Sequence, residues 1–351
     1  MENNTTNKKI IAISFAAIFL LNRILTGISN VIVMSGFRGS YDTTAESALS
    51  SYQSSFLIDI ANLAVNIITI GIIILLGKKL TSNKIRTILF LGCYYFGSAV
   101  GTLFSSLVNN VFQYLMRSAI LPTTASTIMN ISSILCLVPA AFAAYMAFTA
   151  FEGINGKIPA HPVNVSLSKA RRLFIITVVI TALFGGVIVS IPNLLIALIN
   201  PESDSFASEA LIFSGYLVKW LSSVIAFAVV YIAGYITTKS HFGALSFYLP
   251  ASAISVPITN IIGNISSIAV DALRYVFQLK LLEAAEPDYS MIANTSSATT
   301  IIASITGLIS VIIGFIISYK ALGLFYTNEI VYENHVAPQT YPEAPIESDT
   351  L

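Results

Sequence analysis

The sequence predicts an all-α integral membrane protein, with eight transmembrane helices that form two parallel four-helix repeats about a pseudo-two-fold axis along the membrane normal. Three observations predict this: the composition, the long apolar segments and the correspondence between the two halves of the chain. Hydrophobic residues occupy 55% of the 351 positions and charged residues only 10%, whereas soluble domains have roughly 25% charged residues. The mean hydropathy of +0.80 indicates that lipid surrounds most of the chain.

Eight apolar segments are long enough to cross the hydrocarbon core, which takes about 20 residues of helix. The predicted spans are residues 10–33, 57–77, 86–108, 127–150, 173–199, 211–237, 244–268 and 299–320. The first span begins like a signal peptide, because Lys8 and Lys9 precede the apolar run Ile10–Leu21. Apolar residues continue to Met34 without a small-residue cleavage site, so we expect this segment to be retained as a helix.

Basic residues are distributed unevenly between the two sides of this eight-helix arrangement. Most of the 18 Lys and Arg residues, including Lys8, Lys79, Arg171 and Lys320, fall on the side of the two termini. Because basic loops stay in the cytoplasm, we expect a cell-membrane protein with both termini cytoplasmic. The lipid bilayer is therefore the partner that the composition predicts, and no basic run suggests nucleic acid.

The two halves of the chain correspond at four places, in the same order. Residues 8–34 match 171–197, Lys79 matches Lys239, 111–122 match 276–287 and Tyr145 matches Tyr319, at offsets of 163, 160, 165 and 174. Each half contains an even number of spans, so both halves enter the membrane from the same side. The predicted repeat is therefore parallel.

The correspondence divides the chain into four parts. They are a first repeat at 1–150, a cytoplasmic connecting loop at 151–170, a second repeat at 171–326 and an acidic tail at 327–351 that we expect to be disordered. The loop or the tail offers a docking segment for a cytoplasmic protein partner. The amphipathic segments 111–122 and 276–287 are expected to lie along the outer membrane interface.

Arg23 lies in the middle of the first span, where a permanently charged guanidinium costs several kcal/mol. Its counterpart in the second half is Gly186. One interpretation is that Arg23 binds an anionic group of a substrate; the other is a structural cation that reaches towards the interface. Asn30 and Asn193 correspond to each other, and we expect both to line a polar seam between the repeats as substrate-binding residues.

Asp59 and Lys219 stand at equivalent positions of the two halves and carry opposite charges. They are predicted to form an ion pair across the two-fold axis, either structural or acting as a gate; the structural role is the simpler interpretation, because both lie near a helix end. Pro139 frees a backbone carbonyl at membrane depth. The spacing of Gly97 and Gly101 predicts close helix packing.

Several kinds of catalytic site are missing from the sequence. All three histidines lie in predicted cytoplasmic segments, and there is neither an HExxH motif nor a P-loop. We therefore predict no metal and no cofactor.

The predicted function is a multi-pass membrane transporter or flippase-like protein that moves a small solute, an ion or a lipid-like molecule through the polar seam. The alternative is a non-catalytic membrane subunit or anchor of a larger complex, such as the membrane half of an ABC-type system. A third interpretation is an intramembrane enzyme acting on lipid-linked substrates through an outer-loop acid such as Asp42 or Glu46.

Overall fold

The computed structural model describes a bundle of long helices. The described residues are 2–36, 44–81, 84–119, 131–132, 134–153, 166–183, 217, 220–222, 224–225, 227–236, 241–283 and 289–324. The elements with defined bounds are α1 (Glu2–Gly36), α2 (Thr44–Thr81), α3 (Lys84–Ala119), α5 (Leu137–Gly153), α6 (Leu167–Ala182), α9 (His241–Glu283), α10 (Tyr289–Ala321) and the 3-10 turn η2 (Leu322–Leu324). Within these ranges there is no strand, so the all-helical prediction is confirmed for the part of the chain that is described.

Five of the described helices are long and apolar enough to cross a membrane. These segments are Lys9–Val33, Gln53–Leu80, Thr87–Val108, Ala251–Phe277 and Ser304–Ala321, and each overlaps one predicted span. Two shorter apolar helices, Leu137–Thr149 and Trp220–Ile236, fall within two further predicted spans. The apolar helices therefore indicate a membrane protein.

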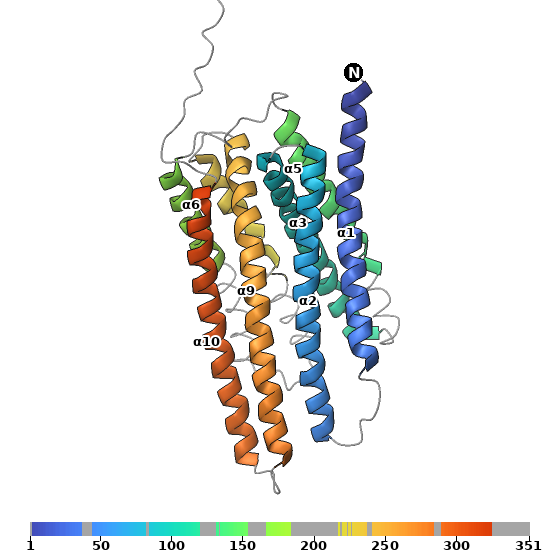
Figure 1. The fold of residues 1–351 in the computed structure, drawn as a ribbon, viewed down its shortest axis with the longest axis vertical. Helices are drawn as coiled ribbons and strands as arrows, with labels where there is room; N and C mark the ends of the chain where they lie inside the picture. The colour runs from blue at the N-terminus through green and yellow to red at the C-terminus, as the bar shows by residue number, and fades with distance from the viewer. Residues whose placement is uncertain are drawn as a thin grey trace, which may run out of the picture.

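The helices pack in two rows (Figure 1). The helices α10, α9, α2 and α1 stand in front in the view, and α6, α3 and α5 lie behind them. The helix α2 packs against α1, α3 and α9, and α3 packs against α5 and α9. We call the end of the bundle at which α1 begins the N-terminal end.

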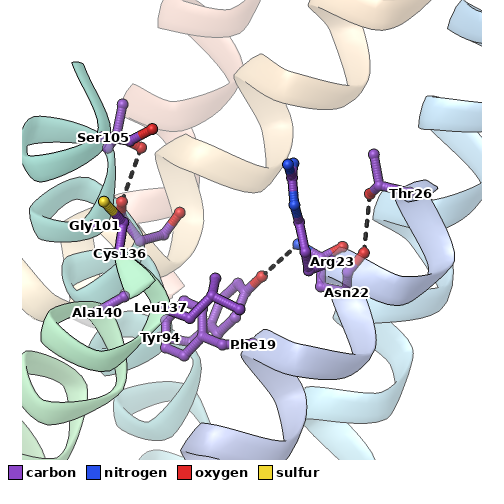
Figure 2. Close-up of a pocket in the computed structure, with 12 residues that line it drawn as sticks. Phe19, Asn22, Arg23, Thr26, Tyr94, Gly101, Ser105, Cys136, Leu137 and Ala140 are labelled. Carbon is purple, nitrogen blue, oxygen red and sulfur yellow. Dashed lines mark hydrogen bonds between the residues drawn. The ribbon is translucent and has the colours of Figure 1, made fainter. Parts of the chain in front are cut away.

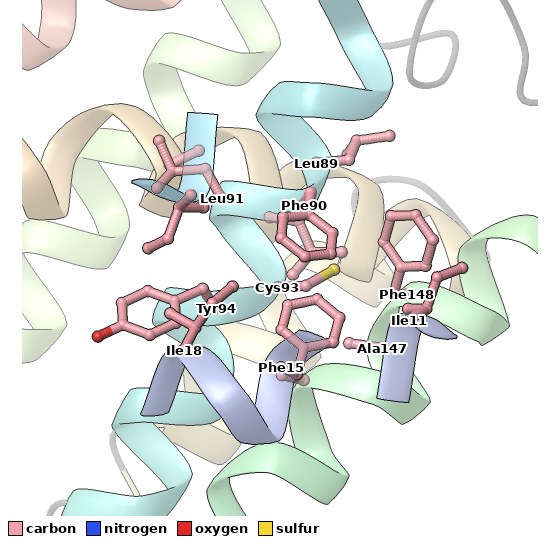
Figure 3. Packing of buried hydrophobic residues seen from close by; sticks show 14 of the residues in the cluster. Ile11, Phe15, Ile18, Leu89, Phe90, Leu91, Cys93, Tyr94, Ala147 and Phe148 are labelled. Atoms are coloured by element: carbon pink, nitrogen blue, oxygen red, sulfur yellow. The ribbon is translucent and has the colours of Figure 1, made fainter. Parts of the chain in front are cut away.

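A cluster of apolar side chains, which we call the first core, lies mainly between α1, α3 and α5 in the N-terminal half of the bundle, and α2 and α9 also contribute residues to it. Phe15 of α1 stacks on Phe90 of α3 with ring centroids 4.3 Å apart, and Phe148 of α5 meets Phe90 edge-on at 5.6 Å (Figure 3). All three rings are fully buried. Such pairs stabilise the folded state by about 0.5–1.5 kcal/mol each beyond the effect of their buried area, so they stabilise the packing of this part of the bundle.

Glycines let the backbones approach closely around α3. A Cβ atom at Gly97 would collide with the carbonyl oxygen of Ala140 in α5, and one at Gly101 would lie 2.8 Å from the Ala140 Cβ. On another face, a Cβ at Gly92 would collide with the carbonyl of Leu249 in α9. The close packing predicted from Gly97 and Gly101 is therefore confirmed.

The second core joins α6, α9, α10 and η2. Phe174 of α6 stacks on Phe315 of α10 with centroids 5.5 Å apart, and Phe315 lies 6.0 Å from Tyr319. The guanidinium carbon of Arg171 lies 4.7 Å from the centre of the Tyr319 ring, a cation–π contact. The second core therefore includes a charged group, whereas the first does not.

The prediction for the amphipathic segments was wrong. The helix α3 continues to Ala119 and α9 to Glu283, so both segments extend the spans that precede them. With 43 residues, α9 is about 64 Å long, roughly twice the thickness of the hydrocarbon core. Between each span and its amphipathic segment the sequence has no Gly or Pro to end the helix, so the backbone hydrogen bonding continues.

Candidate binding cavity

A cavity of about 210 Å³ lies between α1, α3 and the start of α5 (Figure 2). Its lining consists of Phe19, Asn22, Arg23 and Thr26 from α1, Tyr94, Ser98, Gly101, Thr102 and Ser105 from α3, and Cys136, Leu137 and Ala140 at the start of α5. The α1 and α3 positions each recur every three or four residues, which places them on one helix face. The cavity is thus framed by two facing stripes of side chains.

Aromatic rings form the floor of the cavity towards the N-terminal end. Phe19 of α1 stacks on Tyr94 of α3 with centroids 4.7 Å apart, and both residues also belong to the first core. Beneath them lie the stacked rings of Phe15 and Phe90. The first core therefore closes the cavity on this side.

Asn22 connects three helices at the floor. Its Nδ2 donates a hydrogen bond to the Tyr94 hydroxyl at 3.1 Å, and its Oδ1 accepts one from the Thr69 hydroxyl of α2 at 3.2 Å. An amide at membrane depth has to find partners within the protein, and Asn22 finds them on α2 and α3. Its role is therefore to hold α1 against these helices.

Arg23 lies beside Asn22 on the cavity-lining stripe of α1, with its side chain exposed. In Figure 2 the side chain extends away from the hydrogen bond between Asn22 and Tyr94. The structure thus places the predicted intramembrane cation in a cavity and not within the packed core. A guanidinium there can reach water or a ligand.

Four hydroxyl residues line the cavity together with Arg23. Ser98, Thr102 and Ser105 come from α3, and Thr26 comes from α1, the helix that carries Arg23. The Thr102 hydroxyl donates to the Ser98 carbonyl at 2.9 Å, and the Thr26 hydroxyl donates to the Asn22 carbonyl at the same distance. These oxygens still have lone pairs to accept further bonds, and a hydroxyl that rotates can donate to a ligand in place of the backbone carbonyl.

The start of α5 supplies the third wall. The α-helix begins at Leu137, Cys136 is in a turn, and Pro139 follows two residues into the helix. Proline removes one backbone hydrogen bond and disfavours a regular helix through the preceding turn. The interruption predicted at Pro139 therefore coincides with the cavity, and it brings the Cys136 thiol to the cavity wall.

Of the remaining predicted site residues, two lie outside the cavity and two lie outside the described residues. Asn30 is exposed on α1, seven residues beyond Arg23, and does not line the cavity. Asn193 and Lys219 lie outside the described residues. The ion pair predicted between Asp59 and Lys219 therefore stays a prediction.

Asp59 of α2 instead lies close enough to Asp271 of α9 for their charges to interact. Asp271 is buried, and its Oδ1 lies 3.2 Å from Nη1 of Arg274 on the same helix. This cluster is at the contact between α2 and α9, away from the residues that line the cavity.

The sequence analysis did not single out the hydroxyl stripe on α3. Its signal was present, because Ser98, Thr102 and Ser105 recur at helical spacing within an apolar span. Hydroxyl residues in membrane helices usually bond to their own backbone, so the spacing alone does not distinguish a cavity wall.

Among the described residues, no three His, Cys, Asp or Glu side chains gather in a way that could hold a metal ion. Comparison with known proteins finds no matching family model, no matching curated protein and no matching solved structure.

Proposed function

We propose that this protein is a multi-pass membrane transporter or flippase-like protein of the cell membrane, with both termini cytoplasmic. The observation that carries the proposal is the cavity that Arg23 lines together with four hydroxyl residues. Ionisable residues within spans usually mark the path of a substrate or an ion. The substrate path in this proposal starts between α1, α3 and α5, and not in the seam between the two halves.

One-sided access supports a transport cycle. The first core and the stacked rings of Phe19 and Tyr94 block the cavity towards the N-terminal end. With cytoplasmic termini, the blocked side is the cytoplasmic one, so the proposal expects access from the outer side. A carrier that alternates between two states has such a one-sided cavity in each of them.

The contacts between helices support the two-repeat architecture that this cycle uses. In the two-repeat architecture the pseudo-two-fold axis relates α3 to α9, and it relates α2 to the helix Trp220–Ile236. Because α2 packs on α9, this symmetry requires Trp220–Ile236 to pack on α3. Two contacts fit this requirement: Trp220 Nε1 donates to the Leu103 carbonyl at 3.0 Å, and the rings of Phe96 and Phe227 lie 5.8 Å apart. In the proposal, the two halves rock about the contact between α3 and α9.

The test measures water access at Ser98, which lines the cavity. Ser98→Cys is placed in a background with Cys93→Ala and Cys136→Ala, and a charged, membrane-impermeant thiol reagent is added from one side at a time. We expect labelling from the outer side. Ile73→Cys, in the fully buried part of α2, is the matched control and stays protected.

Protection of position 98 from both sides, with the protein still inserted, would contradict the proposal. Arg23 would then be a structural cation, and the alternative of a membrane subunit or anchor would replace transport. A soluble protein that co-purifies with the chain would support that alternative.

A further inference from the structure

We infer that the acidic tail, residues 327–351, binds to a basic surface at the N-terminal end of the bundle, where α6 begins and α10 ends. This contact is independent of the transport cycle proposed above. The tail itself lies outside the described residues. Three features carry the contact: the charge of the described surface, the place where the described chain ends, and the composition of the tail.

The basic surface consists of four cations close to the contact between α6 and the end of α10. Lys169 and Arg172 are exposed and lie one turn apart on α6, and Lys320 is exposed at the end of α10. The fourth cation is Arg171, whose guanidinium carbon lies 4.7 Å from the centre of the Tyr319 ring. None of the four forms an ion pair with a described residue. The surface is therefore strongly positive.

The start of α6 adds to this positive charge. Its N-cap residue Ser166 accepts a hydrogen bond from the backbone N–H of Lys169 at 3.5 Å, and its first turn contains no acidic residue. The N-terminus of a helix carries roughly half a positive charge, because its first N–H groups have no partner within the helix. An anion close to the start of α6 is therefore favoured by the backbone as well as by the side chains.

Arg171 also lacks hydrogen-bond acceptors. It has no hydrogen bond to a described residue, and its buried Nε is without a partner. The cation–π contact with Tyr319 engages the flat face of the guanidinium, whereas the N–H donors point outward in its plane. Carboxylates match this planar fork of donors. A carboxylate brought to Arg171 would thus supply what the described helices do not.

The described chain ends beside this surface. The 3-10 turn η2 packs on α6, and a Cβ added at Gly323 would lie 3.9 Å from Nη2 of Arg171. Figure 1 shows α6 next to the end of α10 from which the chain continues. The first acid of the tail, Glu329, follows Leu324 by five residues, which span up to about 17 Å when extended. The tail is therefore long enough to fold back over η2 onto the surface.

The tail has the complementary composition. It contains no Lys or Arg and five acids, which are Glu329, Glu333, Glu343, Glu347 and Asp349. A single exposed ion pair contributes little to stability. The tail, however, is joined to the surface, which holds its acids there at an effective concentration in the millimolar range, and several pairs can form together. The tail of the same chain is therefore the occupant that the surface fits.

The experiment measures how fast a disulfide forms between α6 and the tail. Ser168→Cys, at an exposed position of α6, and Ser348→Cys, in the tail, are combined in the full chain with Cys93→Ala and Cys136→Ala. The protein is placed in phosphatidylcholine vesicles, which have no net surface charge, and a mild oxidant is added at low salt. The neutralised tail for comparison carries Glu329→Gln, Glu333→Gln, Glu343→Gln, Glu347→Gln and Asp349→Asn.

Each disulfide rate is corrected for the reactivity of the thiol on α6. The correction is the rate at which a small uncharged reagent labels the chain that carries Ser168→Cys alone, with the same charge substitutions. It is needed because nearby cations lower the pKa of a thiol and thereby change its reactivity.

We expect the native tail to form the disulfide about ten times faster than the neutralised tail, because binding raises the local concentration of its thiol at α6. At about 1 M salt the two rates should converge, since the Debye length falls to about 3 Å. Lys169→Gln with Arg172→Gln should slow the native tail nearly as much as neutralisation does. Lys78→Gln with Lys79→Gln, which removes two exposed cations at the end of α2, is the matched control and should leave the rate unchanged.

Three outcomes would overturn the contact. Equal rates for the native and the neutralised tail would reject it and leave the basic surface to anionic lipid head groups. A difference that persists at about 1 M salt would reject charge as its cause. If the α2 variant slows the reaction as much as the α6 variant, then the tail responds to the overall charge of this end of the bundle, and a specific surface at α6 is rejected. The cavity is tested separately, by the labelling at position 98.

Discussion

Two groups of helices can be compared: the first consists of α1, α3 and α5, and the second of α6, α9 and α10. Each group contains a close contact at a glycine, but the glycine is on a different helix and meets a different kind of atom. In the first group the glycine is on the middle helix, where Gly97 of α3 admits the backbone of Ala140 in α5. In the second group the glycine is on the last helix, where a Cβ at Gly314 of α10 would lie 3.1 Å from the Thr259 side chain of α9. The close contact of the first group is therefore with backbone atoms, and the close contact of the second group is with a side chain.

The two cores also differ in how well their buried polar atoms are hydrogen-bonded. At the first core the Tyr94 hydroxyl accepts a hydrogen bond from Asn22, whereas around the second core Arg171 Nε and Ser318 Oγ are buried without a hydrogen-bond partner. A buried donor without a partner costs about 1–3 kcal/mol. The second group is therefore packed less favourably, and we expect it to be the one that rearranges while the first holds the cavity.

The largest expected effect is the loss of an aromatic ring from the first core. Phe90→Ala removes a fully buried ring that touches Phe15 and Phe148, and should lower the free energy of unfolding by about 3–5 kcal/mol. Phe315→Ala, in the second core, should cost less because Phe315 is only partly buried. Unfolding in mixed detergent micelles measures both, and equal losses would remove the contrast between the cores.

Overfilling the two glycine contacts should have the next largest effect. Gly97→Leu drives a side chain into the Ala140 backbone and should destabilise the protein by about 1–3 kcal/mol or more. Gly314→Leu should cost less, because its added Cβ would lie 3.1 Å from a side-chain methyl group and would not collide with backbone. Gly307→Leu is the control, since nothing lies within 4 Å of its added Cβ, and it should be close to neutral. A larger loss at position 314 than at 97 would reverse the comparison.

The floor of the cavity should show a smaller effect. Asn22→Ala removes the hydrogen bonds to Tyr94 and Thr69, and hydrogen bonds between membrane helices contribute about 0.6 kcal/mol on average and up to about 1.7. A double-mutant cycle with Tyr94→Phe isolates the coupling of the first pair. A coupling of zero would mean that stacking with Phe19 alone holds the floor.

Much of the fold followed from the sequence because it depends on local composition. Long apolar runs predict spans wherever they occur, and the spacing of Gly97 and Gly101 predicts a close approach whichever helix fills it. Arg23 stood out because a cation in a span is rare. These features can be recognised without knowing which helices are neighbours.

The place of the cavity depends on neighbours and was therefore not predictable. Ser98 and Ser105 become a cavity wall only because α1 and the start of α5 stand beside them, and no local pattern encodes which helices are neighbours. The course of α9 past Phe277 was missed for a related reason. An amphipathic pattern is the same whether a helix lies on the interface or extends a span beyond it.

The smallest expected effect compares two buried serines. Ser318 of α10 is 1% exposed, and its hydroxyl has no partner, so Ser318→Ala should stabilise the protein by up to about 1 kcal/mol. Ser252 of α9 is 6% exposed, but its hydroxyl donates to the Leu249 carbonyl at 3.0 Å, so Ser252→Ala should be neutral or slightly destabilising. The same detergent unfolding measures both variants. If Ser318→Ala destabilises, then the hydroxyl has a partner in the membrane-embedded protein, and the second group is packed as favourably as the first.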